Sequence, residues 1–273
     1  MSLHFKINCT MMNLDLTGKK ALVGGSTQGI GKAVAMELAS MGASVTLLAR
    51  NEESLKQAKA DLPTLHNQTH QVLVADFSYP EFLKSVLKEH IGAGNQYNIL
   101  INNTGGPAGG PANEAAIEEF RIAFNQHLIC NHILAQALLP GMKETGYGRI
   151  VNIISTSVKI PLNGLGVSNT VRGAVANWSK TMANELGAFG VTVNNVLPGA
   201  TNTSRLSSLI AAKAEKTGQS TEALYDGFKN QVPMKRIAEP NEIANAVAFL
   251  ASPAASYING VNLPVDGGRT GSL

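Results

Sequence analysis

Cysteine and aromatic residues are scarce in this chain of 273 residues. It has two cysteines, Cys9 and Cys130, and aromatic residues make up only 5% of it. Two cysteines cannot form a disulfide framework, and no cluster of cysteine and histidine has the spacing of a zinc site. The sequence therefore excludes folds held by disulfides or zinc, predicts no metal site, and is typical of a protein of the reducing cytoplasm.

The sequence also lacks a long apolar run and a strong net charge. No run reaches the roughly 18 apolar residues of a membrane-spanning helix. The first dozen residues lack the apolar centre of a signal peptide, so we interpret residues 1–12 as a leader or flexible N-terminus before a domain over 13–273. The formal net charge is +3 and the cationic residues are dispersed, which predicts neither a nucleic-acid partner nor a membrane partner.

The most informative stretch joins an apolar strand, a glycine-rich turn and a helix. Ala21–Val23 predicts a buried strand, and glycines follow at positions 24, 25, 29 and 31, before the helical run 32–41. The N–H groups and the dipole at a helix N-terminus attract anions, and glycine lets the backbone approach a pyrophosphate closely. The stretch predicts a phosphate-binding site, and a glycine turn without a ligand is the alternative.

Apolar strands alternate with helices along the rest of the chain. The other strands are expected at 44–49, 71–75, 98–101, 149–154, 192–197 and 261–265. The other helices are expected at 52–61, 79–90, 114–143, 165–187 and 241–251. Strands that are apolar throughout are typical of a parallel sheet covered on both faces. Two short helices in 203–230 break the alternation after the sixth strand, and since ligands bind at the carboxyl ends of such strands, we expect a lid there.

Six short motifs occur in the order and at the spacing of one enzyme family. They are GGSTQGIG at 24–31, Asp76, NNTG at 102–105, GRIVNIIS at 148–155, PG at 198–199 and DGG at 266–268. On these motifs the chain resembles the short-chain dehydrogenase/reductase family over about residues 14–270, and most nearly the 3-oxoacyl-carrier-protein reductases. The resemblance implies a single α/β domain with a Rossmann doubly wound, seven-stranded parallel sheet, a small helical lid after strand six, and a homotetramer or dimer.

The resemblance also implies a nicotinamide cofactor. In relatives that bind NAD, an Asp often stands where this chain has Ala49, and Arg50 follows at the expected adenosine ribose. A guanidinium pairs with a 2′-phosphate that a carboxylate would repel. We therefore predict NADP(H) in preference to NAD(H), and a solvated Arg50 at a helix start is the alternative.

By the same resemblance, three polar residues have distinct roles toward the cofactor. Asp76 is expected to hold the adenine amino group, Asn102 to support the adenosine side, and Thr203 to bond the nicotinamide amide. The residues expected to bind the cofactor follow the strand ends and are Gly25, Ser26, Thr27, Gln28, Gly29, Ile30, Gly31, Arg50, Asp76, Phe77, Asn103, Thr104, Gly105, Arg172, Pro198, Gly199, Thr201 and Thr203.

The catalytic positions of the family do not match. The family has a Ser, a Tyr 13 residues later, a Lys four residues after that, and an Asn on the long helix. Ser155 fits the first position, whereas Ser168, Arg172 and His127 stand at the other three. A serine hydroxyl is a far weaker acid than a phenol, and arginine stays protonated. Ser168 and Arg172 are therefore expected to bind and position a ligand without running the usual proton relay.

Two functions stay open at this point. The first is an NADP(H)-dependent oxidoreductase that reduces a 3-oxoacyl-like or other small ketone, or oxidises the alcohol. Ser155 would polarise the oxygen, and His127 would supply the proton directly or through water, because histidine titrates near neutrality. A packed, hydrogen-bonded His127 is the alternative. Asn131, one helical turn later, is a residue that could face the same cleft, and the Tyr225 phenol of the expected lid is a further candidate donor if the lid closes. The second function is a catalytically impaired NADP(H)-binding sensor or partner subunit.

Overall fold

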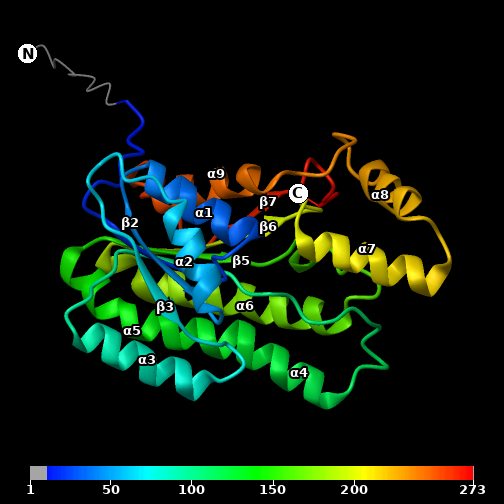
Figure 1. The fold of residues 1–273 in the computed structure, drawn as a ribbon, viewed down its shortest axis with the longest axis horizontal. Helices are drawn as coiled ribbons and strands as arrows, with labels where there is room; N and C mark the ends of the chain where they lie inside the picture. Colours follow the sequence, from blue (N-terminus) through cyan, green and yellow to red (C-terminus); the bar gives the residue numbers. More distant parts are fainter. Residues whose placement is uncertain (1–10, 273) are drawn as a thin grey trace, which may run out of the picture.

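Seven parallel strands form one sheet in residues 11–272, the part of the chain that the computed structural model describes (Figure 1). Their order is β3-β2-β1-β4-β5-β6-β7, which is the expected doubly wound topology. The strands are β1 (Lys20–Gly24), β2 (Ser44–Ala49), β3 (Gln71–Val74), β4 (Ile99–Asn102), β5 (Gly148–Ile153), β6 (Val191–Pro198) and β7 (Asn262–Val265). Each lies within one residue of its expected bounds. The leader expected over 1–12 lies, except for its last two residues, outside the described residues.

Helices cover both faces of the sheet. They are α1 (Gly29–Ser40), α2 (Glu52–Ala60), α3 (Pro80–Gly92), α4 (Ile117–Phe124), α5 (Cys130–Thr145), α6 (Gly166–Leu186), α7 (Ser204–Thr217), α8 (Thr221–Asn230) and α9 (Pro240–Ala251). Short turns of 3₁₀ helix lie at η2 (Thr156–Val158), η3 (Gly187–Phe189) and η4 (Pro253–Ala255). In Figure 1, α1, α2 and α9 lie on one side of the sheet, and α3 to α6 lie on the other. No helix in residues 11–272 is long and apolar enough to cross a membrane.

The strands are apolar throughout because both faces of the sheet are buried. In β1, Ala21 and Val23 pack into the core beneath α1 and α9, while Leu22 between them packs into the core against α3 and α5. Successive side chains of a strand point to opposite faces, so a single run serves both cores. Complete burial of each large side chain contributes about 1.5–3 kcal/mol.

The long helical region expected at 114–143 is divided by a π-helical turn. Helix α4 ends at Phe124, the π turn η1 (Asn125–Ile129) follows, and α5 begins at Cys130. The extra residue in a π turn shifts the helical face, and such turns are frequent at functional sites. This turn carries His127, so it sets the direction of a side chain that the sequence singles out.

The insertion after β6 forms a two-helix unit at one end of the sheet, to the right in Figure 1. Helices α7 and α8 share a small core made by Leu206, Ile210 and Leu224. The two ends of the insertion are tied together, because the Asn202 N–H donates to the Ala238 carbonyl at 2.8 Å and the Ala238 N–H donates to the Ala200 carbonyl at 3.0 Å. The insertion is therefore held at its base.

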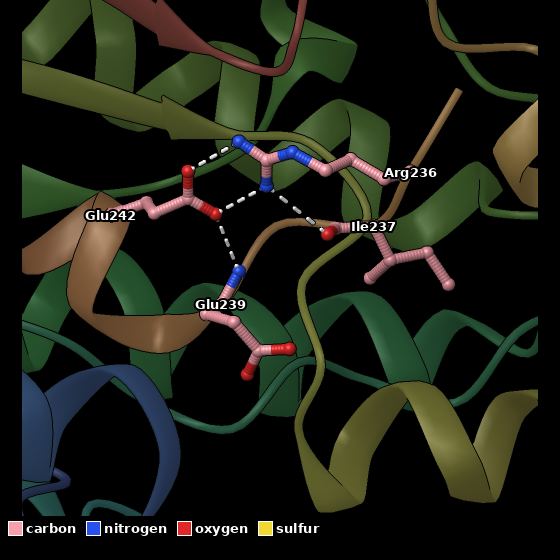
Figure 2. A network of polar contacts seen from close by, with 4 residues as sticks. All are labelled: Arg236, Ile237, Glu239 and Glu242. Atoms are coloured by element: carbon pink, nitrogen blue, oxygen red, sulfur yellow. Dashed lines mark hydrogen bonds and ion pairs between the residues drawn. The ribbon is translucent and has the colours of Figure 1, made fainter. Parts of the chain in front are cut away.

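An ion pair fixes the chain where it leaves the insertion and enters α9 (Figure 2). The Arg236 guanidinium donates to both carboxylate oxygens of Glu242 at 2.6 Å, and the Glu242 carboxylate also accepts from the Glu239 N–H at 2.9 Å. The hydrogen bond from Arg236 lowers the pKa of Glu242 to about 2. Pro240 at the first helical position and this capping contact together define the start of α9.

Candidate active site

One cleft runs along the carboxyl ends of the strands. Residues that follow six strands, β1 to β6, line it, together with the start of α6 and one side of α7, and its volume is about 1580 Å³. Ligands bind at this edge of open parallel sheets because the strand ends and helix N-termini meet there. Within residues 11–272, no group of three or more His, Cys, Asp or Glu side chains is arranged to hold a metal ion.

The glycine turn between β1 and α1 forms one wall of the cleft. Gly25 and Gly29 have φ of +56° and +55°, a left-handed conformation that favours glycine. A Cβ atom on Gly31 would lie 2.2 Å from the Gly25 carbonyl oxygen, so helix and turn can pack this closely only without a side chain. The Asn103 amide donates to the carbonyls of Gly24 and Gly25 at 3.2 Å and holds the turn in place.

Not every predicted residue of the turn faces the cleft. Thr27, Gln28, Gly29 and Ile30 line it. Ser26 is fully buried, and its hydroxyl accepts a hydrogen bond from the Leu48 N–H at 3.0 Å. Ser26 and Gly31 therefore shape the turn from behind, which corrects the prediction that both contact the cofactor.

The adenosine end of the cleft has a cation where a carboxylate would select NAD. Arg50 is exposed and lines the cleft after β2. Asp76 and Phe77 line it after β3, and the Asp76 carboxylate accepts from the Ser78 N–H at 2.9 Å. The glycine turn, the start of α1 and this end together fit a dinucleotide with a 2′-phosphate.

Asn102 does not support the adenosine side, so that prediction is wrong. Its side chain is buried and donates to the Asn152 side chain at 2.7 Å inside the sheet. Because successive side chains of a strand alternate, the next residue, Asn103, faces the cleft instead, followed by Thr104 and Gly105.

The nicotinamide end of the cleft is lined by the loop between β6 and α7. The predicted residues of this loop, Pro198, Gly199, Thr201 and Thr203, all line the cleft. The Thr203 hydroxyl accepts from the Leu206 N–H at 3.4 Å and caps α7. The same hydroxyl donates to the Thr201 carbonyl at 3.3 Å, so a ligand that takes its O–H must replace that bond.

Ser155, Ser168 and Arg172 line one end of the cleft, which we call the catalytic end. The Ser155 hydroxyl accepts from the Ser157 N–H at 3.1 Å, so its O–H can still donate. Ser168 and Arg172 stand on the first two turns of α6. The Arg172 side chain donates to the Ile153 carbonyl at 3.1 Å. Burial, with a smaller effect of the Arg205 charge, lowers the pKa of Arg172 to about 10, so it stays charged at neutral pH.

His127 lies behind the cleft wall. Its side chain is 1% exposed, and its Nδ1 shares a hydrogen bond with the hydroxyl of Thr104, which itself lines the cleft. Burial, with a smaller effect of the Arg172 charge, lowers the pKa of His127 to about 2. The ring is therefore neutral at neutral pH, and the predicted role as a direct imidazolium acid does not fit this environment. His127 reaches the cleft through Thr104.

The other candidate side chains lie outside the cleft lining. The Tyr225 hydroxyl bonds to the Ser207 hydroxyl at 3.1 Å within the insertion. Asn131 is buried, and its Oδ1 has no hydrogen-bond partner among the described residues. Asn131 therefore does not face the cleft in this structure, and the role of Tyr225 on closure of the lid stays a prediction.

Sequence reasoning missed one residue of the catalytic end, Arg205. It stands in the first turn of α7, lines the cleft, and donates to the Pro107 carbonyl on the loop after β4. A cation in the first turn of the insertion expected to be a lid was the available signal. Only the tertiary structure places that turn opposite α6.

Comparison with known proteins gives matches over almost the whole chain. The family model described as enoyl-(acyl carrier protein) reductase matches residues 25–270. The 3-oxoacyl-[acyl-carrier-protein] reductase FabG of Vibrio cholerae is 36% identical over 257 residues, which are 93% of this chain and 98% of that protein. The NADPH-dependent reductase BacG of Bacillus subtilis is 29% identical over 259 residues, 94% of this chain and 100% of that protein.

A similar solved structure has both ligands bound. The L-sorbose reductase of Gluconobacter frateurii, complexed with NADPH and L-sorbose, superposes with a TM-score of 0.89 at 29% identity, over 96% of this chain and 100% of that chain.

Proposed function

Because the chain belongs to the short-chain dehydrogenase/reductase family of NAD(P)-dependent oxidoreductases, we propose that it uses NADP(H) as its cofactor. The proposed reaction is the reduction of a 3-oxoacyl-like or other small ketone, or the oxidation of the alcohol. One observation carries the proposal: the glycine turn, Arg50 and the Ser155 hydroxyl line a single cleft. The relatives described as NADPH-dependent or NADPH-bound support the choice of cofactor.

The residues that would hold the cofactor follow from the geometry of the cleft. Arg50 would pair with the 2′-phosphate, the glycine turn and the start of α1 would take the pyrophosphate, and Thr203 would bond the nicotinamide amide. Arg172 would hold the nicotinamide ribose. Bound NADPH supplies the hydride, and the protein supplies orientation and polarisation.

Ser155 is the proposed group that polarises the substrate. Its O–H donates to the carbonyl oxygen, where negative charge develops as the hydride arrives at carbon. Ser168 adds a second hydroxyl in the same end of the cleft. We propose that the proton reaches the oxygen through these hydroxyls, Thr104 and water. Neutral His127 then serves as a positioning residue that fixes the direction of the Thr104 hydroxyl.

The proposal is tested by following reduced nicotinamide in a single assay. NADPH is titrated by its fluorescence, and a panel of carbonyls that includes a 3-oxoacyl thioester is then added. Binding followed by loss of NADPH is the expected result. Binding without loss of NADPH would instead favour the sensor or partner subunit, and failure to bind NADPH would contradict both functions.

A Ser155→Ala variant tests the role of the hydroxyl. We expect kcat to fall by about 10²–10³-fold, because one preorganised donor to a developing oxyanion contributes that much. The affinity for NADPH should not change. Ser85→Ala is the matched control, because Ser85 is an exposed residue of α3 whose hydroxyl donates to the Phe82 carbonyl. Equal activity of both variants would contradict the role of Ser155.

A further inference from the structure

Two guanidinium groups at the catalytic end have no carboxylate partner in residues 11–272. Arg172 is 8% exposed, and its hydrogen bond to protein goes to the Ile153 carbonyl. Arg205 is exposed, and its hydrogen bond goes to the Pro107 carbonyl. None of the ion pairs of the described residues includes either group. A guanidinium has five N–H donors, so both groups keep the capacity to bind an anion. For the buried Arg172 the lack of an anionic partner is costly as well.

Hydrogen bonds within the protein bring the Arg172 and Arg205 side chains to the same end of the cleft. The loop after β4 is attached to the start of α6, because the Gly110 N–H donates to the Gly164 carbonyl at 2.7 Å and the Gly166 N–H donates to the Gly110 carbonyl at 2.9 Å. Arg205 contacts this loop from α7. The Arg205 charge acts on Arg172, whose pKa is lowered by burial and further by Arg205.

Positive charge dominates the whole cleft. Cationic side chains outnumber carboxylates six to one among its described lining residues. The cations are Arg50, Arg172, Arg205, Lys213, Lys216 and Arg269, and the carboxylate is Asp76. Arg50 and the glycine turn account for the phosphates of the proposed cofactor. Three of the remaining cations, Arg205, Lys213 and Lys216, stand on α7.

We infer that the substrate carries an oxyanion group, a carboxylate or a phosphate, which Arg205 binds at the catalytic end with Arg172 beside it. The planar guanidinium fork matches both groups bidentately. This inference rests on the proposed function, since it places the charged group beside the carbonyl that Ser155 polarises. Among small ketones it selects oxo acids and oxo phosphates over neutral carbonyls.

Binding of matched probes tests the inference without turnover. The protein, with and without NADP⁺, is titrated calorimetrically with pairs that differ in one charge-bearing group. Two pairs test a carboxylate, 3-oxobutanoate with 3-oxobutanamide and 3-oxooctanoate with 3-oxooctanamide. One pair tests a phosphate, dihydroxyacetone phosphate with dihydroxyacetone. We expect the anionic member of the carboxylate pairs or of the phosphate pair to bind at least about tenfold more tightly, which also identifies the oxyanion.

Variants of Arg205 separate anion binding from a structural contact with the loop. In the pair whose anionic member binds more tightly, Arg205→Gln should bring the ratio of the anionic to the neutral affinity close to one and leave the affinity for NADP⁺ unchanged. Arg205→Lys should keep part of that affinity ratio. Arg121→Gln on the exposed face of α4, where Arg121 pairs with Glu118, is the matched control and should keep the full ratio.

Four results would overturn the inference. The first two are an affinity ratio near one in all three pairs and no binding of any probe. The third is an equal loss of affinity for both members of a pair in Arg205→Gln. The fourth is a loss of NADP⁺ affinity in that variant while the affinity ratio between the anionic and neutral probes is kept. Anion-selective binding that depends on Arg205, in a protein that oxidises no NADPH, would support the inference and contradict the proposed function.

Discussion

At the scale of single residues, burial decides what each polar group at the site can do. His127 and Arg172 are both buried near one another, and each one's charge state is set by loss of water first and by a neighbouring cation second. Ser155 is not buried in this way, because it lines the cleft. In the proposed function the hydroxyls therefore act on the substrate, while the buried His127 and Arg172 fix positions.

Arg50→Asp tests the choice of nucleotide. The substitution replaces a cation that would pair with the 2′-phosphate by a carboxylate that would repel it. We expect the affinity for NADPH to fall by about ten- to hundredfold and the affinity for NADH to change little, both measured by nicotinamide fluorescence. An equal effect on the two nucleotides would show that Arg50 is a solvated residue at the start of α2.

His127→Asn tests the neutral state of the buried ring. The folded-state pKa of about 2 lies below the ordinary value of 6.5, so the unfolded chain gains a proton below pH 6.5 that the folded protein does not take up. Wild-type stability should therefore fall as pH drops below 6.5, by about 2 kcal/mol at pH 5 relative to the variant. Denaturant unfolding of both proteins at pH 7.5 and pH 5 measures the difference.

The exposed histidine His66 supplies the control for this experiment. His66→Asn should follow the wild-type protein at both pH values. A His127→Asn variant that loses as much stability as the wild type between pH 7.5 and pH 5 would show that the ring is protonated in the folded protein.

At the scale of elements, the π turn and the two-helix insertion give this sheet its particular cleft. The π turn η1 directs His127 at Thr104, which follows β4. The insertion brings Arg205 over the opposite side of the cleft. Its exit is tied to the start of α9 by the Arg236–Glu242 pair (Figure 2).

Arg236→Gln tests the contribution of this pair to stability. The pKa of Glu242 is lowered to about 2 from an ordinary 4.5, so the pair stabilises the fold above pH 4.5 and loses its effect as pH falls from 4.5 toward 2. We expect the variant to have a Tm lower by about 2 °C at pH 7 and the difference to shrink at pH 3. Lys229→Gln, which removes a single-bond pair with Asp226, should change Tm less.

At the scale of the whole molecule, the helices on one face of the sheet leave apolar side chains in water. Phe82 on α3, Ile122 and Phe124 on α4, and Ile129 in η1 are exposed. In Figure 1 these helices lie on the same side of the sheet. Exposed apolar side chains gathered on one side of a sheet suit an interface, and the long helices are where the family resemblance implies assembly.

We predict that the protein is a homotetramer in solution. Light scattering coupled to size-exclusion chromatography should give four times the mass of the chain, and Phe124→Asp should reduce this to a smaller species by placing a charge in the interface. Gln57→Glu, an exposed position on α2 on the other side of the sheet, is the control for an added charge. A monomeric wild-type protein would contradict the prediction.

The order of elements and the family were already determined by the sequence. Apolar runs such as 44–49 predict strands to within a residue, because a strand buried on both faces must be apolar throughout. The glycines at 25, 29 and 31 predict the phosphate-binding turn, since their conformations and close packing permit no side chain there. That three of the four catalytic positions are changed stays a prediction from spacing.

The roles of the polar side chains were decided only by the tertiary structure. Sequence could not tell Asn102 from Asn103, because which one faces the cleft depends on how β4 pairs with its neighbours. It could not show that His127 is neutral, because its pKa depends on burial by segments distant in the chain. Nor could it place Arg205 in the same cleft as Arg172, since the two residues are distant in the chain and α7 reaches the cleft only through the fold of the insertion.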